Sequence, residues 1–431
     1  MRREPGRLFF LTTQGCKVNQ YESQAIRESL VADGLMETAD PALADIVLIN
    51  SCAVTERAVL DLAKLVRGFA AASPKPWIIV AGCAVEADRE RILGMGLVDE
   101  VIAQKDKAAL TRMNATSSPF PALSISGYNR ARGVIKVQDG CSHGCTYCII
   151  PSTRGKSVSR APEDVVAEAS RLLESGIREI SLCGINLRHY GRDLPGTTDF
   201  WDLLARVDHA LSPRWEGRAR LRLGSLEPGD LSAKALATLT ESRLMTPHLH
   251  LSLQSGSPEV LRRMGRGHYR PEEIFTFLEE LEKIWPVFGL GADLIAGFPG
   301  ETQHHADETL EVVKRLPLSY AHVFPYSERP GTPAASFKGV VPGHVRRERA
   351  KTLRGEVARS RTGFLKRLLG LKTMIVALED GGTGMNEFYV ECTVGSAPAE
   401  TRELLRVEPT GLTSAGLKVR IAAGNGQTEE S

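Results

Sequence analysis

The chain has 431 residues, of which 42% are hydrophobic and 25% are charged, and its formal net charge is only +2. This length allows two or three domains with a sizeable core, and the composition is that of an ordinary globular protein. The near-zero net charge excludes an overall electrostatic attraction to nucleic acid. The first apolar run, Leu8 to Leu11, is too short for a signal peptide, and no segment is long enough to span a bilayer. We therefore expect a cytoplasmic protein with reduced cysteines and no membrane partner.

Three short apolar runs in the N-terminal part each end close to a cysteine. They are residues 8–11 before Cys16, 46–49 before Cys52, and 77–80 before Cys83. Helical patterns at about 19–33 and 55–71 separate the runs, which predicts buried strands of an open parallel α/β sheet. Because the carboxyl ends of such strands meet at one edge, the three cysteines are expected to lie close together. One cysteine alone would more often be a small buried hydrophobe, but three at equivalent positions favour a shared metal site.

Residues 111–121 have the Ser, Thr, Pro and Asn content of a linker and are expected to end the first domain. Strand-like and helix-like patterns then alternate. The expected strands are 134–137, 179–183, 220–223, 249–253, 290–296 and 321–325, and the expected helices lie at about 163–175, 200–211, 231–241, 271–284 and 303–315. Such β-α units predict a partial, open (β/α)6 barrel with its function at the carboxyl ends of the strands.

The first of these strands leads into the closest cysteine spacing in the chain. Cys141, Cys145 and Cys148 form a C-x3-C-x2-C pattern. Three thiolates so placed can hold three irons of a 4Fe-4S cube and leave the fourth iron open. S-adenosylmethionine can chelate an open iron, so that one electron enters its sulfonium and a 5'-deoxyadenosyl radical is released. Tyr147 lies between the second and third ligands, where an aromatic ring can rest against adenine.

A structural zinc site is the alternative for this motif. Zinc closes tetrahedrally on four ligands, and His143 inside the loop could be the fourth. Zinc sites usually use two separated C-x2-C pairs, however, and a histidine within this loop would be cramped. The iron-sulfur interpretation is therefore favoured.

The segment from His344 to Lys372 contains ten Lys or Arg against Glu348 and Glu356. That density can follow a phosphate backbone. The alternative is a solvated helix whose long side chains cover an apolar stripe that includes Leu353 and Val357. The sequence alone leaves both open. After about residue 373, short apolar runs at 374–378, 388–394, 404–407 and 417–421 alternate with Gly-rich turns, which is typical of a small β-barrel.

The segment from Val134 to Gly155 closely resembles the signature of the radical S-adenosylmethionine methylthiotransferases. The resemblance covers nearly the whole chain and implies an N-terminal α/β domain at 7–120, a radical SAM partial barrel at 127–357 and a TRAM-like RNA-binding barrel at 372–424. It also implies a second 4Fe-4S cluster on Cys16, Cys52 and Cys83. The residues that it implies at the S-adenosylmethionine, besides Tyr147, are Gly184, Asn186, Gly297 and Pro299.

Within this family the strings at 15–21, 247–255 and 322–327 look most like the branch that acts on N6-threonylcarbamoyladenosine at position 37 of tRNA. The implied reaction places CH3-S on C2 of that adenine, next to the anticodon, with an electron donor and a sulfur donor from outside the chain. Relatives that act on isopentenyladenosine or on a ribosomal protein aspartate are the alternatives within the class. A non-enzymatic iron-sulfur sensor that binds RNA is the alternative from another class.

Two positions depart from the family pattern. Cys183 stands where relatives usually have Thr, and Gly224 stands where Ser is common. Cys183 is interpreted as a small apolar substitute. Cys392 falls in a predicted strand of the C-terminal barrel and is expected to be part of its core.

Overall fold

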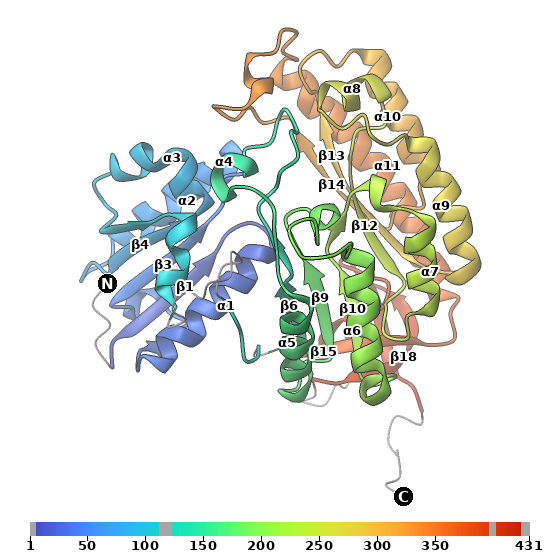
Figure 1. Cartoon of the computed structure of the whole chain (residues 1–431), viewed down its shortest axis with the longest axis horizontal. Helices are drawn as coiled ribbons and strands as arrows, with labels where there is room; N and C mark the ends of the chain where they lie inside the picture. Colours follow the sequence, from blue (N-terminus) through green and yellow to red (C-terminus); the bar gives the residue numbers. More distant parts are fainter. Residues whose placement is uncertain (1–5, 112–122, 129, 396–401, 424–431) are drawn as a thin grey trace, which may run out of the picture.

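The computed structural model describes residues 6–111, 123–128, 130–395 and 402–423. The chain forms an N-terminal α/β part, a central barrel part and a small C-terminal barrel, which the colours of Figure 1 follow from blue to red. The expected linker at 111–121 lies outside the described residues except for Thr111. Within the described part of the chain, no helix combines the length and apolar character that crossing a membrane requires.

The N-terminal part contains a five-stranded parallel sheet with the order β2-β1-β3-β4-β5. Its strands are β1 (Leu8–Thr13), β2 (Met36–Glu37), β3 (Ile46–Ser51), β4 (Trp77–Gly82) and β5 (Glu100–Ile102), and its helices are α1 (Lys17–Ala32), α2 (Glu56–Ala70) and α3 (Cys83–Leu93). Every residue of the central strand β3 is buried. A strand covered on both faces needs a continuous apolar run, which explains why the sequence pattern identified it.

The central part forms two hydrogen-bonded parallel sheets, ordered β10-β9-β6 and β11-β12-β13-β14. The strands are β6 (Arg132–Lys136), β9 (Glu179–Cys183), β10 (Arg220–Leu223), β11 (Ser225–Leu226), β12 (His248–Gln254), β13 (Gly289–Ala296) and β14 (Tyr320–Pro325). The helices are α4 (Ile150–Arg154), α5 (Pro162–Glu174), α6 (Phe200–Trp215), α7 (Ala233–Glu241), α8 (Pro258–Arg263), α9 (Pro271–Ile284) and α10 (Gln303–Arg315). A short antiparallel pair, β7 (Gln138–Asp139) and β8 (Val158–Ser159), brackets the cysteine loop. The predicted α/β class with a partial barrel is confirmed.

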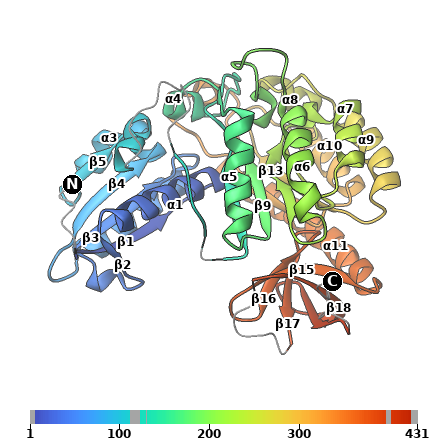
Figure 2. The same cartoon turned by 60° about the horizontal axis from the view of Figure 1, so that its bottom comes forward.

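Helix α1 belongs to both parts. Its Val18, Tyr21 and Ala25 side chains join the hydrophobic core of the barrel. Ile26 and Leu30 join the core beneath the N-terminal sheet instead. Residues three or four apart lie on one face of a helix, so the helix buries two neighbouring faces against two different sheets. Both views in Figures 1 and 2 place α1 between the N-terminal sheet and the barrel.

The long helix α11 (Gly343–Leu369) leads from β14 to the C-terminal barrel, which lies below the central part in Figure 2. The barrel is closed in the order β15-β16-β17-β19-β18. Its strands are β15 (Met374–Glu379), β16 (Thr383–Asn386), β17 (Glu391–Val394), β18 (Leu404–Leu412) and β19 (Leu417–Ile421). The predicted small β-barrel is therefore confirmed.

The prediction for this barrel was wrong in three details, one of which is the length of β18, expected at 404–407 but running to Leu412. Strand β16 was missed because its residues, Thr-Gly-Met-Asn, carry no apolar alternation. The expected strand at 388–394 begins only at Glu391, because Asn386 turns the chain there. The Asn386 Oδ1 accepts hydrogen bonds from the amides of Phe388 at 3.1 Å and Val390 at 2.8 Å, and Tyr389 has a φ of 64°.

Candidate active site

The loop that carries Cys141, Cys145 and Cys148 follows β7 and is fastened to the rest of the barrel part by backbone hydrogen bonds. The Cys141 amide donates to the Gly155 carbonyl at 3.0 Å, and the Thr146 amide donates to the Met264 carbonyl at 3.0 Å. Gly140 has a φ of 64°, and a Cβ there would lie 2.0 Å from the Lys156 carbonyl oxygen. Only glycine fits that turn, so the backbone conformation of the cysteine loop is determined by the protein's own sequence.

The three thiols are held in a partly buried environment. Burial raises the pKa of Cys141 and of Cys145, and it raises the pKa of Cys148 to about 12. Arg266 opposes the shift at Cys145, because its Nη1 lies 3.7 Å from the Cys145 Sγ. Such thiols remain protonated at neutral pH until a metal displaces the proton.

The His143 ring, which the alternative zinc site would use as a fourth ligand, bonds elsewhere. Its Nε2 lies 2.8 Å from the Gly265 carbonyl oxygen, and its ring packs edge-on against His268 with centroids 5.0 Å apart. In the described chain, one group of three ligand atoms that lie within 4.8 Å of one another belongs to His143, Glu227 and His268. With its Nε2 bonded to Gly265, His143 is not placed as the fourth ligand of a zinc ion at the cysteines.

The loop after β9 lies directly against the cysteine loop. The Asn186 Nδ2 is 3.7 Å from the Cys141 Sγ, and the Asn186 amide donates to Gln138 Oε1 at 2.8 Å. A Cβ on Gly184 would come within 2.9 Å of the Gln138 side chain. The structure thus places Asn186 beside Cys141 and Gly184 beside Gln138.

The loop after β13 approaches the cysteine loop from another side. Gly297 has a φ of 79°, and its amide donates to Glu301 Oε1 at 2.9 Å. The next residue, Phe298, packs edge-on against Tyr147 with ring centroids 6.4 Å apart. Pro299 is buried in the same loop. Tyr147 and the end of β13 are therefore neighbours.

Sequence reasoning missed an ionic group at this site. Arg266 pairs with Glu227 at 2.8 Å and also donates to the Ser252 carbonyl at 2.8 Å, and both side chains of the pair are at most 5% exposed. His268 Nε2 lies 3.5 Å from the second Glu227 oxygen. Glu227 follows a predicted strand end and could have been singled out. Arg266 and His268 lie in the loop after α8, where no periodic pattern marks them.

The second cysteine trio lies at the ends of three neighbouring strands. Cys16 precedes α1, Cys52 follows β3 and Cys83 begins α3, and the strands before them, β1, β3 and β4, are adjacent in the sheet. A Cβ on Gly15 would lie 2.8 Å from the Cys52 Sγ, so the first two loops touch. Burial raises the pKa of Cys52 to about 11. The three thiols converge as strand-end reasoning predicted.

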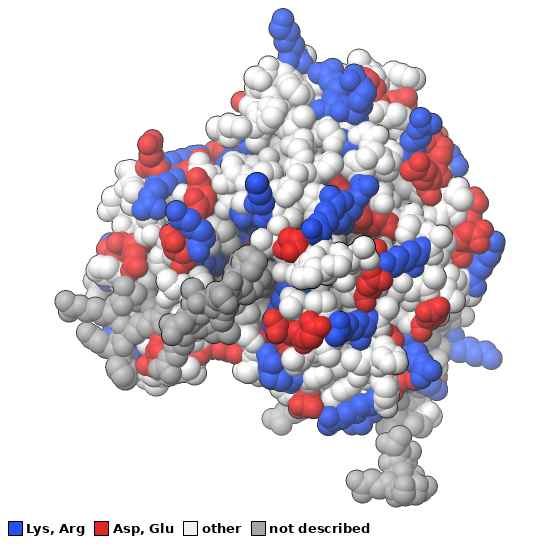
Figure 3. All heavy atoms as spheres, in the orientation of Figure 1, with Lys and Arg blue, Asp and Glu red and all other residues white. Residues whose placement is uncertain are grey.

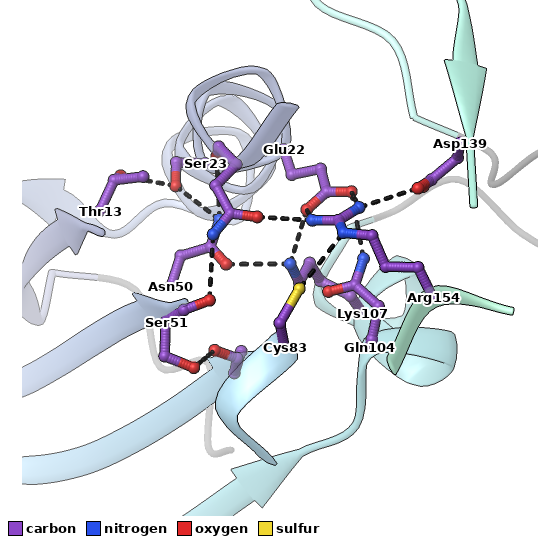
Figure 4. Close-up of polar contacts among 12 residues, drawn as sticks. Thr13, Glu22, Ser23, Asn50, Ser51, Cys83, Gln104, Lys107, Asp139 and Arg154 are labelled. Atoms are coloured by element: carbon purple, nitrogen blue, oxygen red, sulfur yellow. Dashed lines mark hydrogen bonds and ion pairs between the residues drawn. The ribbon is translucent and has the colours of Figure 1, made fainter. Parts of the chain in front are cut away.

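A buried polar network lies between Cys83 and the short helix that follows Cys148, and Figure 4 shows its centre. Arg154 is the last residue of α4, which follows Cys148. Its Nε donates to the Cys83 Sγ at 3.2 Å, its Nη1 lies 3.0 Å from Glu22, and its Nη2 lies 2.6 Å from Asn19 Oδ1. Asn19 and Glu22 both belong to α1. Because Asn19 is part of the string at 15–21, that string contributes to this network.

The two departures from the family pattern are in contact. Cys183 is 3% exposed, and burial raises the pKa of its thiol to about 12. A Cβ on residue 224 would lie 3.2 Å from the Cys183 Cβ, which is tighter than usual. Gly224 therefore leaves room for the side chain of Cys183. Cys392 is fully buried in the core of the C-terminal barrel, as expected.

Helix α11 carries the basic run, and several of its arginines bond within the protein. Arg346 donates to the Tyr326 carbonyl at 2.8 Å, Arg349 pairs with Glu301 at 2.9 Å, and Arg361 donates to the Ser319 carbonyl at 3.1 Å. The apolar stripe is buried at Ala350, Leu353, Val357, Phe364 and Leu368. The exposed members that remain for a phosphate backbone include Arg347 and Lys351. On the face drawn in Figure 3, basic and acidic side chains are interspersed.

Known proteins resemble this chain over most of its length. The model of the radical SAM superfamily matches residues 135–313, and that of the uncharacterized protein family UPF0004 matches residues 8–103. The threonylcarbamoyladenosine tRNA methylthiotransferase MtaB of Rickettsia prowazekii is 34% identical over 392 residues, which cover 88% of this chain and 90% of that protein. The chain belongs to the radical SAM methylthiotransferases.

Further similarities support this family. The MtaB of Chlamydia pneumoniae is 35% identical over 421 residues, covering 94% of this chain and 97% of that protein. The tRNA-2-methylthio-N(6)-dimethylallyladenosine synthase of Clostridium botulinum is 32% identical over 371 residues, covering 80% of each. Among solved structures, the radical SAM methyltransferase TsrM of Kitasatospora setae aligns with a TM-score of 0.56 at 13% identity over 77% of each chain. That last likeness concerns the fold alone.

Proposed function

We propose that this methylthiotransferase places CH3-S on C2 of N6-threonylcarbamoyladenosine at position 37 of tRNA, by radical chemistry that uses two 4Fe-4S clusters. The observation that carries the proposal is the pair of three-cysteine sites in a chain similar to two MtaB proteins over most of its length. An aromatic C2–H is too inert for a side-chain base, so a radical is needed, and the sulfur needs a carrier of its own.

Cys141, Cys145 and Cys148 are the proposed ligands of the radical SAM cluster. Their C-x3-C-x2-C spacing, on a loop that backbone hydrogen bonds hold in place, suits a cube with one thiolate on each of three irons. When bound, this cluster supplies the electron that cleaves S-adenosylmethionine. Gly184 and Asn186 beside Cys141, and Gly297 and Pro299 beside Tyr147, are the proposed contacts of S-adenosylmethionine. Arg266 lies beside the Cys145 sulfur and holds Glu227 at the same site.

Cys16, Cys52 and Cys83 are the proposed ligands of the second cluster. The convergence of their strand ends supports this assignment, and so does the buried cation Arg154 at the Cys83 sulfur. Thiolates on a cluster are anionic, so a cation there stabilises the loaded site. The proposed role of this site is to carry the sulfur atom that is transferred. The external sulfur donor and electron donor are separate partners.

We assign sulfur transfer to the proposed domain at 7–120 and radical generation to the proposed domain at 127–357. The proposed domain at 372–424 is assigned to tRNA binding. Glu379 and Tyr389, which lie in the proposed TRAM-like barrel, contact the central part of the chain. Glu379 accepts hydrogen bonds from Arg132 at 2.9 Å and from the Ala131 amide at 2.8 Å, and the Tyr389 ring lies 4.8 Å from that of His248. These residues anchor the barrel, so other side chains must contact the anticodon loop.

Mass spectrometry of tRNA nucleosides from a deletion strain tests the substrate. We expect 2-methylthio-N6-threonylcarbamoyladenosine to disappear, the unmethylthiolated nucleoside to accumulate, and the isopentenyl analogue to stay unchanged. Loss of only the isopentenyl product, or of a methylthio group on a ribosomal protein, would assign the enzyme to another branch. A purified, reduced and reconstituted protein that makes no 5'-deoxyadenosine would instead support a sensor.

A further inference from the structure

Arg154 links the segment of one cysteine trio to a cysteine of the other. It ends the short helix that follows Cys148, and its side chain is 1% exposed. In Figure 4 its guanidinium group lies between the carboxylate of Glu22 and the sulfur of Cys83. The hydrogen bond from Nε to the Cys83 Sγ is 3.2 Å long. The remaining guanidinium nitrogens bond to Asn19, Glu22 and Asp139, so the orientation of the group is fixed.

The ion pairs around Arg154 contain more cations than carboxylates. Glu22 pairs with Lys107 at 2.6 Å, Lys136 at 3.0 Å and Arg154 at 3.0 Å, and Asp139 pairs with Lys136 and Arg154 at 2.9 Å each. All five side chains are at most 5% exposed. Burial opposes ionisation of Glu22, but the adjacent cations outweigh it and hold the pKa of this carboxyl well below its usual range. Burial lowers the pKa of Lys107, so the positive charge that lies next to the Cys83 sulfur is that of the Arg154 guanidinium.

A buried positive charge is costly unless a negative charge lies close to it. Three thiolates around an oxidised 4Fe-4S cube carry about one negative charge overall, and reduction adds another. The Arg154 guanidinium and the loaded site are therefore complementary. Hydrogen bonds to the sulfurs and nearby charge are two of the factors that set a cluster's reduction potential. Arg154 provides both at Cys83.

We propose that Arg154 is a positioning residue of the N-terminal cysteine site, which raises the reduction potential of a cluster held by Cys16, Cys52 and Cys83. The inference rests on the proposed two-cluster function. It makes the redox properties of the N-terminal site depend on the segment that carries Cys141, Cys145 and Cys148.

The test uses the full chain with Cys141, Cys145 and Cys148 replaced by Ala, which leaves the N-terminal site as the only cysteine trio. Its midpoint potential is measured by redox titration followed by electron paramagnetic resonance. Arg154→Gln and Arg154→Lys are then introduced separately into this parent. We expect a lower midpoint in both, with the larger shift for Gln, which removes the charge as well as the hydrogen bond. Arg154→Lys keeps the positive charge that pairs with Glu22 and Asp139. This variant therefore keeps the test valid if Arg154→Gln does not fold.

Arg160→Gln is the matched control. Arg160 is also buried at the interface with α1, where it pairs with Glu168 and donates to the Tyr21 hydroxyl at 3.3 Å, but its bonds reach no sulfur. Its variant should keep the parental midpoint. An equal shift in this control would mean that a loosened interface changes the potential, and it would overturn the proposal. A parental midpoint in the folded Arg154 variants would overturn it as well.

The parent also separates this inference from the proposed function. A parent that holds no cluster would refute the two-cluster function and the role of Arg154 together. A parent with a normal cluster, whose midpoint does not respond to Arg154→Lys or Arg154→Gln, would refute only the role of Arg154.

Discussion

Glu22 of α1 accepts a hydrogen bond at 3.0 Å from Lys136 of β6, and the two side chains are 1% and 0% exposed. Strand β6 leads into the loop of Cys141, whereas α1 begins next to Cys16. The contact between the N-terminal sheet and the barrel is therefore ionic at its centre and apolar around Val18 and Ala25. Ionic groups buried this deeply depend on one another, because each lacks water as an alternative partner.

The first prediction follows from that dependence. Glu22→Gln leaves Lys107, Lys136 and Arg154 with Asp139 as their remaining carboxylate in the ion-pair set, so we expect a loss of about 3–5 kcal/mol in the free energy of unfolding. Urea denaturation followed by circular dichroism measures it. The control is Glu37→Gln, whose partner Arg27 is 32% exposed, where about 0–1 kcal/mol is expected. Similar losses in both variants would contradict the importance of the buried network.

The second prediction concerns the pH dependence of stability at Asp230. Burial, followed by the charge of nearby Glu227, raises the pKa of the Asp230 carboxyl to about 7. In the unfolded chain it titrates near 3.9, so the folded protein holds this proton more tightly. Its contribution to stability is complete below about pH 4 and is lost as the pH rises to about 7, by roughly 4 kcal/mol.

Asp230→Asn removes this titration and keeps an acceptor for the Glu227 amide, which lies 3.1 Å from the carboxylate. The variant should match the parent near pH 4 and become the more stable protein as the pH approaches 8. Urea midpoints of both proteins across this range give the comparison. A constant difference between them at every pH would show that Asp230 does not titrate in this window.

Much of the fold was predictable because local signals agree with the final structure. The predicted bounds of β9, β10, β19, α9 and α10 coincide with the observed ones. Helix α9 has Pro271 at its first turn, and α10 has Thr302 as its N-cap, so sequence marks both starts. Strand β16 could not be predicted from local signals, because a short Gly-containing strand lacks an apolar pattern. Its position is defined only by closure of the barrel.

The site was predictable where one strand end positions one residue. Cys16, Cys52 and Cys83 follow strands that are adjacent in the sheet, so their convergence could be inferred from order alone. The contact of Arg154 with Cys83 could not, because it joins two parts of the chain that no local pattern relates. Arg266 was missed for the same reason, since its loop is defined only by packing beneath Cys145.

The third prediction separates the two surfaces that can bind tRNA. Arg347 and Lys351 are exposed one turn apart on α11, and Lys418 and Arg420 are exposed on β19. Replacing both members of a pair by Glu should weaken tRNA binding if that pair binds phosphates. The log-log slope against salt should then fall by about one unit for each phosphate that the variant no longer neutralises. An unchanged affinity and slope for the α11 variant would show that this helix does not bind tRNA. Its role would then be the structural one indicated by the bonds of Arg346 and Arg349.

The fourth prediction assigns different steps to the two cysteine trios. Replacement of Cys141, Cys145 and Cys148 by Ala should abolish both 5'-deoxyadenosine formation and methylthiolated tRNA, because no open iron remains for S-adenosylmethionine. Replacement of Cys16, Cys52 and Cys83 by Ala should preserve 5'-deoxyadenosine and abolish the methylthiolated product. Either triple variant should contain about four iron atoms per chain where the parent contains about eight, if each trio holds one cube.

Folding has to be checked first for the Cys16, Cys52 and Cys83 variant, because the buried Arg154 guanidinium loses the Cys83 sulfur, and any cluster on it, as a partner there. Circular dichroism on the variant, with Arg154→Gln added to remove that charge, distinguishes a folding defect from a catalytic one. A variant that folds in either form and yet keeps its full iron content would contradict the assignment of a cluster to this trio. One that still methylthiolates tRNA would show that the transferred sulfur comes from elsewhere, since no cysteine would remain at the N-terminal strand ends to carry it.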